Sequence, residues 1–325
     1  MTVKAIGANA GLTTQPYVEP MNTAVPDQTG DPAAQQLLRT ELARSRRSLA
    51  AMPTVLACLA GGAAPALFSE EVIARTRGMI DSLAEHLLRE VSDGQAEPLS
   101  PAGLAGELAR IEPLLVHCHS IALEGGLLGR LALGGIDPVL VPLLQDLISD
   151  EDPEEAALAM KVLAAQSRFV QSWRRMELPL AELPAEVAET VLDAFAHICG
   201  EAVRDAVARL RSGMDEATSR TAMMARMLIS ARGGLNLALD LERAGGSMFV
   251  SALSLSTGMS RNDVVHAVVD GRQARLALLL AACGVEPGAR SATLTRLCPD
   301  ATVPSAAIQL SSEQARALLA EEVSV

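Results

Sequence analysis

The chain has 325 residues, and hydrophobic residues occupy 49% of its positions, enough to bury a sizeable core. Aromatic residues make up only 2%, so the core must consist mainly of leucine, alanine, valine and methionine, which favours helices over strands. The net charge of −12 repels phosphate backbones and argues against nucleic-acid binding, and the sequence predicts no membrane insertion because it has no long apolar run.

The sequence divides into three parts. Residues 1–30 lack apolar periodicity and predict a mobile N-terminal tail. Residues 31–99 predict an N-terminal helical segment that ends in a polar linker. Residues 100–325 are expected to form one helical domain, since no low-complexity tract divides them. The five scattered cysteines indicate reduced thiols, and we expect a cytoplasmic protein.

The clearest pattern lies in residues 137–184, which predict two consecutive antiparallel helices. The pairs Asp137-Pro138 and Asp152-Pro153 mark the helix starts, because Asp caps the first turn and Pro needs no donor there. The second helix is expected to end before Pro179. Its apolar stripe consists of Leu158, Val162, Phe169, Trp173 and Met176. This pairing resembles a HEAT repeat, so we predict an all-α fold, a multi-helix array with HEAT-like helical hairpins and no β-sheet.

Two stretches resemble a known family. The sequence AALAMKVLAAQSRFVQSWRRMELPLAELPAE at residues 156–186 resembles the signature region of the DUF2336 family of alphaproteobacterial helical proteins. Residues 249–287 are similar to the closing segment of that family. The resemblance implies that residues 100–325 form a DUF2336-like helical domain of a bacterial cytoplasmic protein. It implies no activity and no catalytic residue, and residues 1–99 depart from it.

Sequence patterns of catalytic sites are missing from the chain. There is no phosphate-binding loop, no dinucleotide-binding glycine pattern after a strand, and no nucleophile elbow. The glycine-rich stretch at residues 125–129 lies among apolar residues without a lysine, which favours close helix packing. We therefore expect a protein that is not an enzyme and that carries no cofactor.

A basic cluster on the second helix of the pair is the strongest candidate for protein binding. It comprises Lys161, Arg168, Trp173, Arg174 and Arg175. Lys161, Arg168 and Arg175 recur every seven residues, about two helical turns, so they form a row along one side. Tryptophan often anchors interfaces, although the place of Trp173 in the apolar stripe favours a core position. Acidic residues of adjacent helices would neutralise the row; otherwise it fits an acidic protein partner.

The first hypothesis is therefore a non-enzymatic helical interaction, regulatory or scaffold protein. The alternative is a signalling phosphotransfer protein that uses His86, because its helix resembles that of histidine phosphotransfer domains. A third hypothesis is a metal or ligand sensor that uses His117 and His119, although residues two apart on a helix point in different directions. We expect no metal site, and the sequence leaves a homo-oligomer open.

Overall fold

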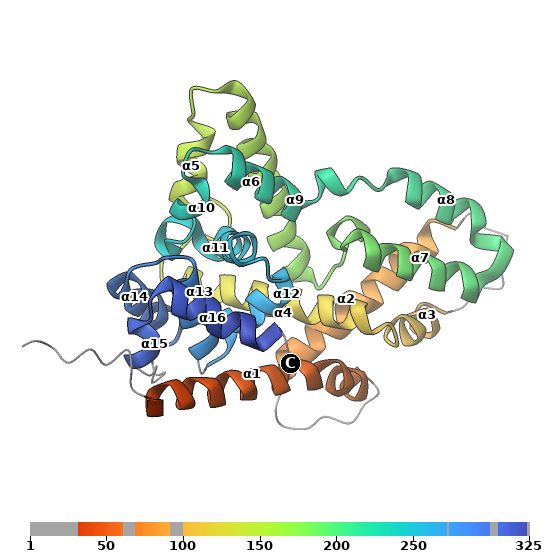
Figure 1. Ribbon diagram of the computed structural model, residues 1–325. Helices are drawn as coiled ribbons and strands as arrows, with labels where there is room; N and C mark the ends of the chain where they lie inside the picture. Colours follow the sequence, from red (N-terminus) through yellow and green to blue (C-terminus); the bar gives the residue numbers. More distant parts are fainter. Residues whose placement is uncertain (1–31, 61–68, 92–99, 272, 300–304, 324–325) are drawn as a thin grey trace, which may run out of the picture.

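The computed structural model describes residues 32–60, 69–91, 100–271, 273–299 and 305–323. Within these ranges the chain is helical and has no strand, as the composition predicts (Figure 1). The predicted tail at residues 1–30 lies outside them. In chain order the α-helices are α1 (Pro32–Ala60), α2 (Glu70–Arg89), α3 (Pro101–Leu108), α4 (Glu112–Leu133), α5 (Pro142–Ile148), α6 (Pro153–Arg175), α7 (Ala185–Cys199), α8 (Arg204–Gly213), α9 (Arg220–Ser230), α10 (Gly234–Leu237), α11 (Leu241–Thr257), α12 (Arg261–Val269), α13 (Ala274–Ala282), α14 (Pro287–Leu297), α15 (Ser305–Gln309) and α16 (Ser312–Val323). Short 3₁₀ turns, η2 (Leu180–Glu182), η3 (Gly200–Val203) and η4 (Glu216–Thr218), separate some of them.

Two hydrophobic cores meet along α4 and α6. The first core packs α5, α9 and α11–α16 together, and the second packs α2, α3, α7 and α8. Helix α6 contributes Val162 to the first core and Phe169 to the second, and both side chains are buried. In Figure 1, α7 and α8 form an arm on the right, and the α5–α6 hairpin rises at the top. Helix α1 contributes to both cores as well, with Leu38 in the first and Met52 in the second, so α1, α4 and α6 connect the two cores.

Helix α6 begins and ends where the sequence predicts. The carboxylate of Asp152 accepts a hydrogen bond from the N–H of Glu154 at 2.8 Å, and Pro153 is the first helical residue. The helix ends at Met176, which adopts a left-handed conformation with φ 57°. Met176 is exposed although it closes the predicted stripe, because its left-handed backbone turns the chain away from the helix.

The start predicted for the first helix of the pair is wrong. Helix α5 begins at Pro142 and not at Pro138, so it is only 7 residues long. Asp137 instead closes a turn, in which its Oδ1 accepts hydrogen bonds from the N–H groups of Val139 and Leu140 at 2.7 and 2.8 Å. Aspartate favours such turns as readily as it caps helices, so the motif itself does not distinguish the two.

The described helices of the predicted N-terminal segment share both cores with later residues. Helix α2 packs against α3 and α4, and α1 packs against α4 and α13. Both helices thus contact residues beyond position 99. The predicted domain boundary at residue 99 stays a prediction. Within the described ranges, no helix is both long enough and apolar enough to cross a bilayer.

Candidate functional site

The structure places the predicted basic row on the surface of α6. Lys161, Arg168, Arg174 and Arg175 are all exposed. Nη1 of Arg175 lies 3.6 Å from a carboxylate oxygen of Glu177, on the same side of the molecule. Over the part of the chain that the structure describes, no carboxylate lies within ion-pair distance of Lys161, Arg168 or Arg174. Most of the row therefore remains unneutralised.

Trp173 faces the opposite way and joins α6 to α2 and α4. The guanidinium of Arg75 lies over its indole ring at 4.1 Å, and Nη1 of Arg75 donates to the carbonyl oxygen of Trp173 at 3.1 Å. A Cβ added at Gly125 of α4 would lie 2.2 Å from Cε2 of the indole. The glycine-rich stretch thus serves close helix packing, as the sequence indicates, and Trp173 is a packing residue within the basic cluster.

The histidines of the other two hypotheses are not gathered in one place. His86 of α2 is half-buried and lines a cavity of about 600 Å³ beside α7 and α8. Nε2 of His117 lies 2.9 Å from the carbonyl oxygen of Glu182, whereas the ring of His119 stacks on His266 with centroids 5.2 Å apart. No group of three or more His, Cys, Asp and Glu among the described residues could hold a metal ion.

A buried ionic cluster, which the sequence did not reveal, lies where α4, α9 and α12 meet. Its centre is the carboxylate of Glu124, which is 2% exposed. Nη1 of Arg220 lies 3.0 Å from Oε1 of Glu124, and Nη2 of Arg261 lies 2.7 Å from the same oxygen. Oγ of Ser247 donates a further hydrogen bond to this oxygen at 2.7 Å. The carboxylate is therefore fully engaged by donors from three helices.

Further contacts of Arg220 extend the cluster to α6 and η2. Nε of Arg220 lies 3.2 Å from Oε2 of Glu182, and Nη1 donates to Oε1 of Gln166 at 3.2 Å. The guanidinium also lies 3.6 Å from the ring centre of Phe169. Burial by itself would raise the pKa of Glu124, but Arg220 and Arg261 outweigh it and hold that pKa well below its usual range. The cluster thus links both cores through charged hydrogen bonds.

Helix ends explain why two arginines meet at this carboxylate. Ser219 and Ser260 cap α9 and α12, and the residues that follow them, Arg220 and Arg261, are the first of each helix. A cation at the positive end of a helix dipole is unfavourable unless an anion compensates it. Glu124 provides that anion. The two helices thus begin with the same Ser-Arg pair, which by itself does not identify Glu124 as the partner.

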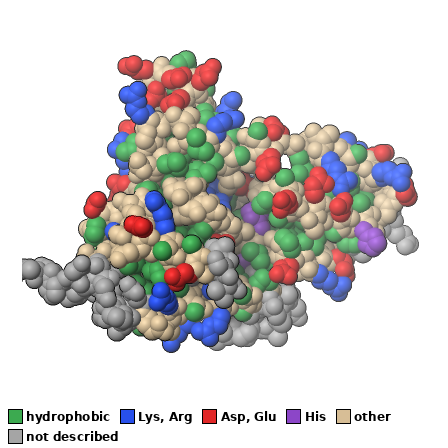
Figure 2. Space-filling view, in the orientation of Figure 1, with side chains coloured by type: hydrophobic (Ala, Val, Ile, Leu, Met, Phe, Trp, Pro, Cys, Tyr) green, Lys and Arg blue, Asp and Glu red, His purple; other side chains and the backbone are tan. Residues whose placement is uncertain are grey.

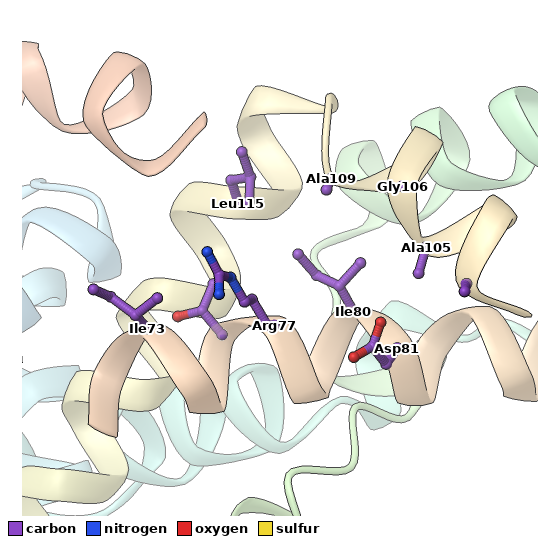
Figure 3. A pocket seen from close by; sticks show the side chains of 10 residues that line it. Ile73, Arg77, Ile80, Asp81, Ala105, Gly106, Ala109 and Leu115 are labelled. Atoms are coloured by element: carbon purple, nitrogen blue, oxygen red, sulfur yellow. The ribbon is translucent and has the colours of Figure 1, made fainter. Parts of the chain in front are cut away.

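A separate apolar pocket of about 220 Å³ lies between α2, α3 and α4 (Figure 3). Figure 3 shows its labelled lining, Ile73, Arg77, Ile80, Asp81, Ala105, Gly106, Ala109 and Leu115. Alanine and glycine on α3 leave room opposite the isoleucines of α2. The lining contains no histidine, cysteine or serine, and its polar side chains are Thr76, Arg77 and Asp81.

Two buried histidines, His119 and His266, and the half-buried His117 predict a loss of stability in acid. Burial lowers the pKa of His117 and of His266 to about 4, and burial together with the neighbouring His266 lowers that of His119 to about 3. In the unfolded chain these imidazoles bind protons near pH 6.5. Below that pH the unfolded state therefore binds more protons than the folded state, in which the imidazoles stay neutral. We expect the free energy of unfolding to fall from about pH 6.5 toward pH 4.

Urea denaturation at several pH values measures this dependence. The slope near pH 5 should approach about three protons taken up per molecule on unfolding. A free energy of unfolding that stays constant between pH 7 and pH 5 would contradict the burial of these imidazoles.

Comparison with known proteins adds no identification. No family model, no curated protein and no solved structure matches the chain. The resemblance to the DUF2336 family stays a prediction, and function has to be inferred from the side chains described above.

Proposed function

We propose that this chain is a non-enzymatic interaction or regulatory protein that binds an acidic partner protein through the basic row of α6. The observation that carries the proposal is the exposure of Lys161, Arg168 and Arg175, of which only Arg175 has a carboxylate within ion-pair distance among the described residues. The whole chain has a net charge of −12, so this row is a local positive region on an acidic protein. Such a region steers and selects acidic partners.

The buried face of α6 supports this role by holding the row in place. Val162 and Phe169 are each no more than 2% exposed, and Trp173 packs between α2 and α4. A helix anchored in two cores presents its outer side chains with little freedom of the backbone, which limits the entropy lost on binding. A bacterial cytoplasmic setting is part of the same proposal and is supported by the family resemblance alone.

Charge reversal tests the proposal against defined probes. A random 12-residue peptide display library is selected on the immobilised protein, and the enriched peptides are expected to be rich in Asp and Glu. The double variant Arg168→Glu, Arg175→Glu should weaken the enriched peptides at least about tenfold, because two attractive charges become repulsive. Its helicity and melting temperature should stay nearly unchanged, since both side chains are exposed.

A matched control changes the net charge equally elsewhere. Arg44 and Arg47 are exposed on α1, which packs mainly against α4 and α13. The variant Arg44→Glu, Arg47→Glu should therefore retain peptide affinity within about twofold. Equal losses in both double variants, or enrichment of peptides without acidic residues, would contradict binding by the α6 row.

A further inference from the structure

The basic row borders a hollow at the C-terminal half of α6. This hollow has a volume of about 310 Å³ and lies between α6, the segment before α7 and the start of α9. Arg168 and Arg175 line it from α6, together with Ser172, and Ser219 lines it from the start of α9. Arg174 does not line it, although it is the neighbour of Arg175. The hollow therefore gathers two of the three row cations around one recess.

A larger hollow of about 600 Å³ adjoins it on the side of α7 and α8. The two hollows share the wall formed by Pro179, Ala181, Thr218 and Ser219. Beyond this wall the lining includes a group of apolar side chains, Leu180, Leu183, Leu210 and Met214. Four acidic side chains, Glu90, Glu189, Asp215 and Glu216, also line this second hollow, together with two arginines, Arg209 and Arg211. Its chemistry thus differs from that of the basic hollow.

A third hollow of about 260 Å³ opens from the same wall toward the ionic cluster. Ala181 lines all three hollows and is itself exposed in η2. The ion pair between Arg220 and Glu182 holds η2 beside the start of α9. Figure 2 shows this face hollowed between the part that carries α9 and the arm of α7 and α8. The hollows therefore form one groove across the junction of the two cores, with Ala181 at its middle.

We infer that this groove binds an extended segment of the acidic partner, with an acidic side chain at the α6 end and an apolar side chain at the α8 end. The inference rests on the proposed function. It adds the order in which the acidic and the apolar side chain of the partner segment lie along the groove. Arg168 and Arg175 attract a carboxylate, and arginine suits carboxylates because its guanidinium forms paired hydrogen bonds. The leucines and Met214 provide an apolar recess for the second side chain, and methionine adapts to varied partners.

The opposite direction of binding is disfavoured by charge. With the segment reversed, its acidic side chain would enter a hollow lined by four carboxylates and two arginines. Arg211 already pairs with Glu189 and Asp193, and Arg209 donates to the carbonyl oxygen of Glu90, so the excess of carboxylates repels an acidic side chain. Glu177 and Glu182 line the basic hollow too, but Glu182 pairs with Arg220 and Glu177 with Arg175. Arg168 also lines that hollow, and no carboxylate of the described chain lies within ion-pair distance of it. Arg168 therefore determines which end of the groove receives the acidic side chain.

Filling the groove from its middle tests the inference. Ala181→Trp places an indole where the three hollows meet, and the exposed position of Ala181 lets the fold accept it. Fluorescence anisotropy with a peptide enriched from the display library should show an affinity loss of at least about tenfold. Ala157→Trp is the control, because Ala157 is exposed on α6 and lines none of these hollows. It should bind as the unchanged protein does.

Changes in the peptide keep the test independent of any folding defect. In the enriched peptides, an acidic and an apolar residue should recur in one fixed order, and replacing the apolar residue by Ser should weaken binding to the unchanged protein about tenfold. Full affinity of Ala181→Trp, or of the Ser-substituted peptide, would overturn the groove. If the Arg168→Glu, Arg175→Glu variant still loses binding in that case, the basic row stands and only the groove is wrong.

Discussion

Glu124→Gln is expected to lower the free energy of unfolding by about 3–5 kcal/mol, the range found when one member of a buried ion pair is removed. The carboxylate is 2% exposed and lies within 3.0 Å of donors from Arg220, Arg261 and Ser247. Glutamine keeps the shape of the side chain but leaves the buried Arg220 and the partly buried Arg261 without their anion. Both arginines are the first residues of helices, where the dipole adds to the penalty. Urea denaturation followed by circular dichroism measures the effect.

An exposed ion pair provides the matched control. Nη2 of Arg243 lies 2.7 Å from Oδ2 of Asp146, as close as the shortest contact of the Glu124 cluster, but both side chains are about half exposed. Asp146→Asn should therefore change the free energy of unfolding by less than about 1 kcal/mol. A loss below about 1 kcal/mol for Glu124→Gln as well would mean that the cluster is not a buried link between the cores.

The second large effect is expected at Gly125, where a methyl group has no space. A Cβ there would lie 2.2 Å from Cε2 and from Nε1 of Trp173, far inside van der Waals contact. The indole cannot move freely, because the guanidinium of Arg75 lies 4.1 Å from the centre of its ring. Gly125→Ala should therefore lower the free energy of unfolding by roughly 2–3 kcal/mol, toward the upper end of the range for overpacking. Thermal and urea denaturation measure this loss.

The next residue of the same helix is the control for this substitution. A Cβ at Gly126 would meet only Nη1 of Arg130, at 4.0 Å, so Gly126→Ala should stabilise the protein by roughly 0.5–1 kcal/mol. Combining Gly125→Ala with Trp173→Leu should give a smaller loss than the sum of the two single changes, because the clash disappears. Strict additivity would show that the indole does not contact Gly125.

Local chemistry made much of the fold predictable from sequence. The composition predicted helices, and Asp152-Pro153 marked the start of α6, because capping and proline geometry depend only on adjacent residues. The same reasoning misplaced the start of α5. The local rule favours Pro138, because Asp137 precedes it, whereas Pro142 follows Val141, which has no capping side chain. Asp137 closes a turn instead, and the helix starts only at Pro142.

The part of the candidate site that the sequence predicted is the part in which helical periodicity determines the side of α6 that each side chain occupies. A spacing of seven residues placed Lys161, Arg168 and Arg175 along one face, and the apolar stripe indicated that Trp173 turns inward. The ionic cluster could not be predicted in this way, because Glu124 is separated from its arginines by 96 and 137 residues. Only tertiary packing brings the starts of α9 and α12 to the middle of α4. The three hollows likewise arise from elements that are distant in sequence.

Hydrogen–deuterium exchange with and without a saturating enriched acidic peptide tests the central claim most directly, because it locates binding without any substitution. We predict slower exchange confined to the C-terminal half of α6, to residues 176–184 and to residues 214–220, which together border the basic row and its groove. Protection that leaves these segments unchanged and falls elsewhere, for example around the apolar pocket between α2 and α3, would contradict the proposed binding site.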